Sequence, residues 1–154
     1  MVSRRQAGFS MVELMVTVTI MLLLALATTP FTRAWADKAA MQQTQSQMRQ
    51  ALAQLRSQAL RNGTAASTGP AAVLVSLQGR LCVFSGAPPT LTCDAAGWSA
   101  VPQATITVNE AASQCLALDS AGLPLSSTIG GTACATNFVY KISRGAEPPN
   151  EQGI

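Results

Sequence analysis

The spacing of hydrophobic residues divides the chain into three stretches. From Phe9 to Phe31 it is apolar apart from hydroxyl side chains, Pro30 and one acid, Glu13. About 20 such residues at ~1.5 Å each make a helix that crosses a ~30 Å hydrocarbon layer. From Ala34 to Arg61, an Ala- and Gln-rich run repeats apolar residues every three, four or seven positions, at Met41, Met48, Leu52, Leu55 and Ala59. The pattern predicts that the spanning helix continues out of the membrane with one apolar stripe, which packs on the protein's own sheet.

After Pro70 the pattern changes to that of β-strands. Asn62-Gly63 is expected to end the helix, because Gly tolerates the left-handed conformation of a helix cap. Runs rich in β-branched and aromatic residues then predict strands at 72–76, 80–84, 105–108, 115–118 and 137–142. Leu77-Gln78-Gly79 suits a hairpin and Asp119 to Gly122 a turn. The sequence therefore predicts an α+β fold, a long N-terminal helix packed on an antiparallel sheet.

Charge and cysteines orient this fold across a membrane. Arg4 and Arg5 precede the apolar stretch, so the positive-inside rule places that tail in the cytoplasm and the rest of the chain on the other side. All four cysteines, Cys82, Cys93, Cys115 and Cys134, follow the stretch, which predicts two disulfides in an oxidising compartment. Cys82 with Cys93 and Cys115 with Cys134 are the pairs nearest in sequence, and three connectivities remain open.

Composition argues against several function classes. The chain has no histidine, which removes the commonest general base and metal ligand, so we expect no enzyme and no cofactor. Without a histidine or a Cys-x-x-Cys pair, a zinc site is disfavoured. The 10 basic and 7 acidic residues nearly balance once Arg4 and Arg5 are set aside, which disfavours general nucleic-acid binding.

Gly8-Phe9-Ser10-Met11-Val12-Glu13-Leu14 resembles the processing site of type IV prepilins. The resemblance implies that prepilin peptidase cuts between Gly8 and Phe9 and methylates the new amine of Phe9. Pairing with that amine on a neighbouring subunit would relieve the buried charge of Glu13, which marks it as an assembly residue. Pro30 falls where pilin helices carry a proline, which favours a kink there over a helix end at Thr28-Thr29-Pro30.

The order of elements is similar to that of minor pilins and pseudopilins of the FimT/GspH type. It implies a leader at 1–8, a transmembrane helix half at 9–33, a periplasmic half at 34–62 and a globular β-rich domain at 63–154. The expected partners are other pilin or pseudopilin subunits, prepilin peptidase and an inner-membrane assembly platform. The expected destination is the inner membrane, and then a pilus or type II secretion pseudopilus.

Two alternatives stay open. Ala34-Trp35-Ala36 fits a conventional signal peptidase, whose cut would release a soluble periplasmic binding module. FimT-like proteins include DNA receptors with a basic C-terminal segment, which draws attention to Lys141 and Arg144. However, Glu147 and Glu151 follow Arg144 and no arginine cluster is present, so DNA binding is the minor expectation.

Overall fold

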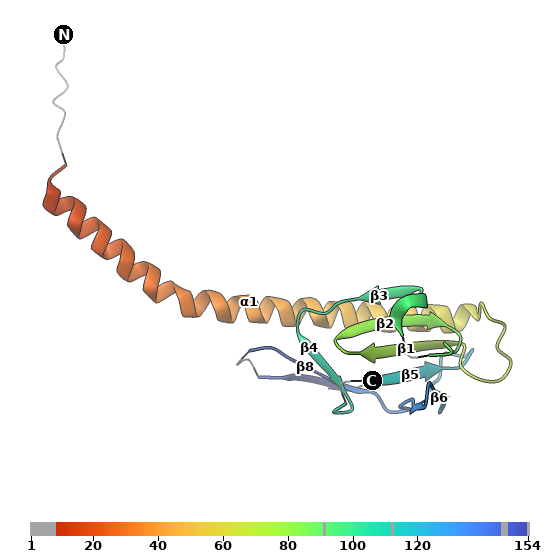
Figure 1. Ribbon diagram of the computed structural model, residues 1–154. Coiled ribbons are helices and arrows are strands. Elements are labelled where there is room, and N and C mark those ends of the chain that lie inside the picture. The colour runs from red at the N-terminus through yellow and green to blue at the C-terminus, as the bar shows by residue number, and fades with distance from the viewer. Residues whose placement is uncertain (1–8, 91, 112, 146–147, 154) are drawn as a thin grey trace, which may run out of the picture. The chain divides into compact units, whose positions relative to one another are not determined.

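The structure is a computed structural model that describes residues 9–153 except 91, 112, 146 and 147. The predicted α+β fold is confirmed, with one long helix followed by antiparallel strands (Figure 1). The elements are α1 (Met11–Arg61), β1 (Ala72–Leu77), β2 (Arg80–Ser85), the 3-10 turn η1 (Cys93–Ala95), β3 (Trp98–Ala100), β4 (Thr105–Val108), β5 (Gln114–Leu118), β6 (Thr128–Ile129), β7 (Thr132–Ala133), β8 (Val139–Ser143) and β9 (Asn150–Gly153).

The chain forms two compact units that divide inside α1, Met1–Ala36 and Asp37–Ile154. We call the second unit the head. It includes the last part of α1, from Asp37 to Arg61, together with all the strands. That part of the helix is thus built into the globular unit rather than standing apart from it.

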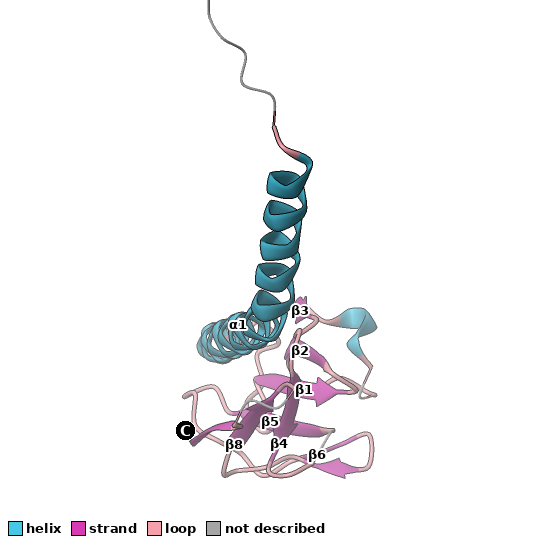
Figure 2. Ribbon diagram, turned by 90° about the vertical axis from the view of Figure 1, so that its left-hand side faces the viewer, coloured by secondary structure: helices cyan, strands magenta, loops and turns pink. Residues whose placement is uncertain are grey.

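The head part of α1 packs on the strands along one face (Figure 2). Its buried side chains recur every three or four residues: Ala40, Thr44, Met48, Ala51, Leu55 and Ala59. Three of these belong to the stripe predicted from the sequence, and its other members, Met41 and Leu52, pack against the same core from the edge. The buried Thr44 hydroxyl accepts a hydrogen bond from the Ala104 N–H at 3.1 Å, which satisfies both groups.

The end of α1 differs from the prediction by one residue. Asn62, not Gly63, adopts the left-handed conformation, with a φ of 44°. The side chain of Asn62 offsets the cost of this conformation by two hydrogen bonds: Oδ1 accepts the Ala66 N–H at 2.8 Å and Nδ2 donates to the Ala66 carbonyl at 3.1 Å. Asparagine tolerates this backbone because its short amide bonds nearby main-chain groups.

Four antiparallel strands form the main sheet, in the order β3-β2-β1-β5. Its central strand β1 is buried on both faces. Leu74 belongs to the core beneath α1, whereas Val73 and Val75 belong to a second apolar cluster on the opposite face. This double burial explains why β1 is a continuous apolar run instead of an alternating one.

The predicted hairpin between β1 and β2 is confirmed. Leu77 pairs with Arg80, which leaves the two-residue turn Gln78-Gly79 between them. Both turn residues have positive φ, 47° and 76°, as a type I′ turn requires. The turn thereby fixes the register of the sheet's central pair.

A second antiparallel sheet has the order β4-β8-β9, and β6 and β7 form a short ribbon. The strand expected at 137–142 begins only at Val139. The side chain of Asn109 holds the preceding backbone, because Nδ2 donates to the Asn137 carbonyl at 2.7 Å and Oδ1 accepts the Val139 N–H at 2.9 Å. The short strands β3, β6, β7 and β9 were not predicted.

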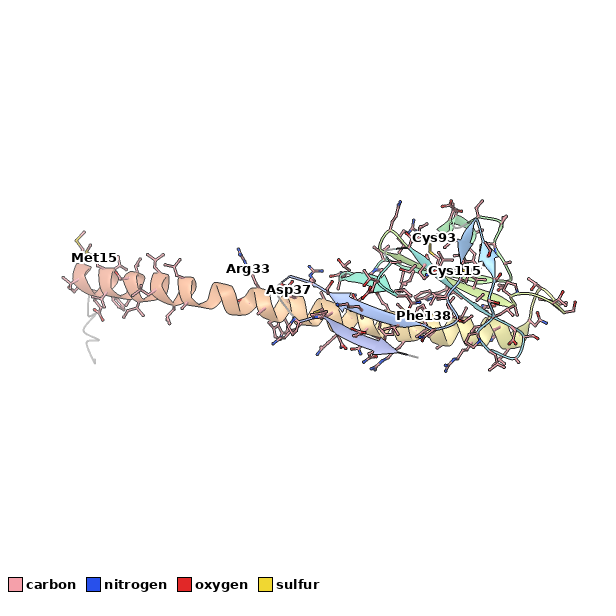
Figure 3. The ribbon with its side chains drawn as sticks, turned by 90° about the horizontal axis from the view of Figure 1, so that it is seen from below. Met15, Arg33, Asp37, Cys93, Cys115 and Phe138 are labelled. Carbon is pink, nitrogen blue, oxygen red and sulfur yellow. A yellow bond between two sulfur atoms is a disulfide. The ribbon has the colours of Figure 1, made fainter. Side chains whose placement is uncertain are left out.

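Both disulfides lie on the face of the main sheet opposite α1 (Figure 3). Cys82 bonds Cys93 and Cys115 bonds Cys134, with Cα atoms 5.7 and 4.5 Å apart, which is the sequence-local pairing. The 3-10 turn η1, the β6–β7 ribbon and the segments beside them cover this face. Closing loops of 11 and 19 residues contributes about 3 kcal/mol each in the chain-entropy model. The two disulfides therefore stabilise a layer that contains little regular secondary structure.

Leu55→Ala is expected to lower the free energy of unfolding by about 2–5 kcal/mol, because Leu55 is 1% exposed in the core beneath α1. Leu60→Ala is the matched control. Leu60 is 65% exposed, so its loss should stay within about 0.5 kcal/mol. Urea unfolding of the full chain in detergent, followed by the fluorescence of Trp98 at the edge of that core, measures both. If both substitutions lowered the free energy of unfolding equally, the burial of Leu55 beneath α1 would be contradicted.

Candidate processing and assembly site

Helix α1 begins directly after Ser10, and Glu13 lies in its first turn. The Ser10 carbonyl accepts the Leu14 N–H at 3.2 Å, so Ser10 occupies the N-cap position. Ser10 and Glu13 then have the Ser-x-x-Glu spacing of a capping box, and the helix dipole favours a carboxylate there. This spacing is visible in the sequence. Helix capping alone can therefore explain a glutamate at position 13, without any contact to a second subunit.

The helix that follows is apolar on all sides. Every large apolar side chain from Phe9 to Leu26 is 49–85% exposed, and these side chains, Met15 among them, project outward from the helix (Figure 3). Within the described residues, α1 is the one helix long and apolar enough to cross a membrane, and its most apolar window is not buried by the protein. Such a surface requires a cover that the described part of the chain does not supply.

Two threonines in this stretch bond their hydroxyl groups within the helix. Thr17 Oγ1 donates to the Leu14 carbonyl at 2.9 Å, and Thr19 Oγ1 donates to the Met15 carbonyl at 2.7 Å. Both threonines therefore satisfy their polar groups within the helix. Glu13 remains the single ionisable residue between Phe9 and Phe31.

The other predicted site residues of this N-terminal part lie before α1 or within it. Gly8 and the rest of the leader fall outside the described residues, and Phe9 is 81% exposed. Pro30 lies inside α1, which runs without a break from Met11 to Arg61, so the helix does not end at Thr28-Thr29-Pro30. Ala34-Trp35-Ala36 lies within the same helix.

Arg144, one of the two possible DNA contacts, is engaged inside the head. Its Nε donates to Asp37 Oδ1 at 3.0 Å, and its guanidinium also donates to the Gln103 carbonyl. The next residue, Gly145, has a φ of 59°, and a Cβ there would collide with the Asp37 carboxylate. The pair thus ties the start of the head's helix to the end of β8, across 107 positions of sequence.

Lys141, the other candidate, is exposed among acids. Lys141 of β8 lies opposite Glu151 of β9 in the strand register, and Glu110 lines the same hollow. A phosphate backbone approaching Lys141 would meet two carboxylates, so the structure brings no basic cluster together here. In the described residues no group of three or more His, Cys, Asp or Glu side chains is placed to hold a metal.

A groove of about 310 Å³ runs between α1 and the second sheet. We call it the basic groove, and it is lined by Arg49, Leu52, Ala53, Arg56, Tyr140 and Gln152. The Tyr140 hydroxyl donates to Gln152 Oε1 at 2.8 Å. Burial raises the pKa of Tyr140, and the nearby Arg49 charge partly offsets that rise. The groove was not predicted from the sequence, because the residues that line it come from three elements that are far apart in the chain.

Residues 3–29 match the family model described as the prokaryotic N-terminal methylation motif. No curated protein and no solved structure matches the chain significantly. With the exposed apolar helix and the α+β head, the motif supports a likeness to type IV pilin-like proteins. The motif is that of pilin-like and pseudopilin-like precursors, which prepilin peptidase processes and which are in general structural subunits that associate with other pilins.

Tyr140 is the chain's one tyrosine, so the ultraviolet absorbance of its phenolate reports on this residue alone. We expect a titration midpoint above the ordinary pKa of 10.0 in the folded chain and near 10 in denaturant. Because the unfolded chain loses this proton first, stability should fall as pH rises above about 10, and Tyr140→Phe should remove that part of the slope. A folded midpoint at or below 10 would contradict the burial of the phenol.

Proposed function

We propose that this chain is a non-enzymatic minor pilin or pseudopilin subunit of the FimT/GspH type, assembled into a type IV pilus or a type II secretion pseudopilus. The observation that carries the proposal is the methylation motif on a helix whose apolar surface the chain itself leaves uncovered. Lipid covers that surface before assembly, and other subunits cover it afterwards. The head then needs no catalytic group.

Prepilin peptidase removes the leader 1–8 by cutting after Gly8, and the amine of Phe9 is methylated. Residues 9–33 span the inner membrane, 34–62 continue the helix into the periplasm, and 63–154 complete the globular domain there. Arg4 and Arg5 support a cytoplasmic leader, and two disulfides suit an oxidising compartment on the other side. Pro30 supplies an adaptable point in the helix, since proline removes one main-chain hydrogen bond.

Glu13 is the assembly residue in this proposal. An acid at the centre of a membrane helix costs about 2.5–3.5 kcal/mol on insertion scales, and less near an end. Glu13 lies four residues, or ~6 Å, beyond Phe9, so in a single inserted chain it can stay near the lipid headgroups. Within a bundle of helices its carboxylate needs a cation, and the terminal amine of a neighbouring subunit is the one that cleavage creates.

The proposal is tested by the mature N-terminus and by two substitutions at Glu13. Mass spectrometry of the native protein should find a chain that begins at methylated Phe9, and a chain that begins at Met1 or at Asp37 would contradict the proposal. Glu13→Leu should be processed normally but fail to enter sheared filaments or the pseudopilus fraction, because it removes the charge.

Glu13→Gln separates pairing from helix capping. Glutamine can replace glutamate in a capping box but carries no charge. We therefore expect assembly to fall as far with Glu13→Gln as with Glu13→Leu, while Met15→Leu, two residues further along the helix, leaves it unchanged. Normal assembly of the Glu13→Gln chain would mean that the carboxylate serves only to cap the helix.

A further inference from the structure

The second sheet presents different chemistry on its two faces. Tyr140 and Ile142 of β8 are buried in the core with α1, whereas Lys141 between them is exposed. Because side chains alternate along a strand, Lys141 and its pairing partner Glu151 belong to the outer face. The basic groove therefore lies on the α1 side of this sheet, and the acids lie on the far side.

The basic groove holds two cations without a counter-charge. Arg49 and Arg56 are both exposed on α1, seven residues apart, and so lie on the same side of the helix. Among the described residues, no carboxylate lies within ion-pair distance of either. The floor between them is Leu52 and Ala53. Two guanidinium groups above an apolar floor suit a carboxylate carried on a short, partly apolar turn.

A turn that carries a carboxylate follows the end of β4, the edge strand of the second sheet. Val108 and Ala111 form an antiparallel bridge around Asn109 and Glu110, which have positive φ angles of 46° and 63°. A glutamate in this region is strained by about 1–2 kcal/mol, and glycine would avoid that strain. Asn109 is fixed by its bonds to Asn137 and Val139, so the turn holds Glu110 rigidly outward. Strain that persists at an exposed acid suggests a function for its position.

Glu110 also lacks an ion pair with any described residue, although Lys141 lines the same hollow. Together Glu110 and Glu151 outnumber that lysine, so the outer side of the sheet is locally acidic. Opposite charges on the two sides of one small sheet are complementary between copies of the chain.

We propose that the Asn109-Glu110 turn of one subunit docks into the basic groove of a second copy, with Glu110 between Arg49 and Arg56. The contact joins two different surfaces, so each subunit keeps a free groove and a free turn for the next copy. A heterologous contact of this kind that does not close into a ring builds a helical filament. The inference rests on the proposed function and adds a specific head-to-head contact to assembly through the N-terminal helix.

Charge reversal in the full chain tests the contact. Sedimentation of the detergent-solubilised protein should show self-association that weakens between about 50 and 500 mM salt, where screening shortens the reach of charges. Arg49→Glu with Arg56→Glu should raise the dissociation constant at least about tenfold, and so should Glu110→Arg. All three changes in one chain should restore the wild-type constant to within about threefold, whereas Arg80→Glu, at the exposed β1–β2 turn, should change nothing.

Cross-linking identifies the residues in contact. Arg56→Lys keeps the charge and supplies an amine, which a carbodiimide joins to a nearby carboxylate as an amide with loss of water. In a mixture of isotopically labelled and unlabelled chains, peptides linking position 56 to Glu110 between chains would support the contact. Arg80→Lys is the matched control and should give no such peptide.

The outcomes separate this contact from the proposed function. Any of three results would overturn the contact. These are self-association that does not depend on salt, a triple variant that associates no better than the double or single charge-reversal variant, and cross-links from position 56 to other carboxylates. The proposed function would still stand if the chain begins at methylated Phe9 and assembles through Glu13. Binding of a DNA duplex through Arg49 and Arg56, with no self-association, would likewise overturn the contact.

Discussion

The architecture depends on one constraint, the removal of the apolar surface between Phe9 and Leu26 from water. Ten of its large side chains are Leu, Ile, Phe or Val, each worth about 0.3–0.6 kcal/mol on insertion scales, or ~3–6 kcal/mol together. One carboxylate at the membrane centre would cost about 2.5–3.5 kcal/mol and so cancel most of that gain. The position of Glu13 in the first turn of the helix is therefore compatible with insertion in a way that a central acid would not be.

The same helix supplies the main face of the head's core. From Ala40 to Ala59 its small and aliphatic residues fill one side of two sheets, and Asp37 is held by Arg144 where the head begins. The opposite face of the main sheet is covered by two cross-linked segments, which include the 3-10 turn η1 and the β6–β7 ribbon. A compact unit of 118 residues, Asp37–Ile154, thus has a core on both faces of its main sheet, one beneath α1 and one beside two disulfides.

Features that depend on local sequence could be predicted. The stripe through Met48 and Leu55 follows from helical periodicity, and the β1–β2 hairpin follows from Gln78-Gly79 between apolar runs. Features that depend on contacts distant in sequence could not. The start of β8 is set by Asn109, some 30 positions earlier, and β9 is a polar strand with no β-propensity to mark it. The Asp37–Arg144 pair has no sequence signal.

The two roles proposed for Glu13, capping and pairing, differ in what they require, which makes them compatible. Capping acts within one chain, and a carboxylate in the first turn typically gains about 0.3–1 kcal/mol from the helix dipole, whether or not another subunit is present. Pairing acts only between chains, and it gains strength as lipid headgroups and water are excluded around the carboxylate. One carboxylate can therefore hold the first turn of α1 in order before assembly and select a neighbouring amine during it. The helix end is then already rigid when the cation arrives, so less conformational entropy is lost in forming the pair.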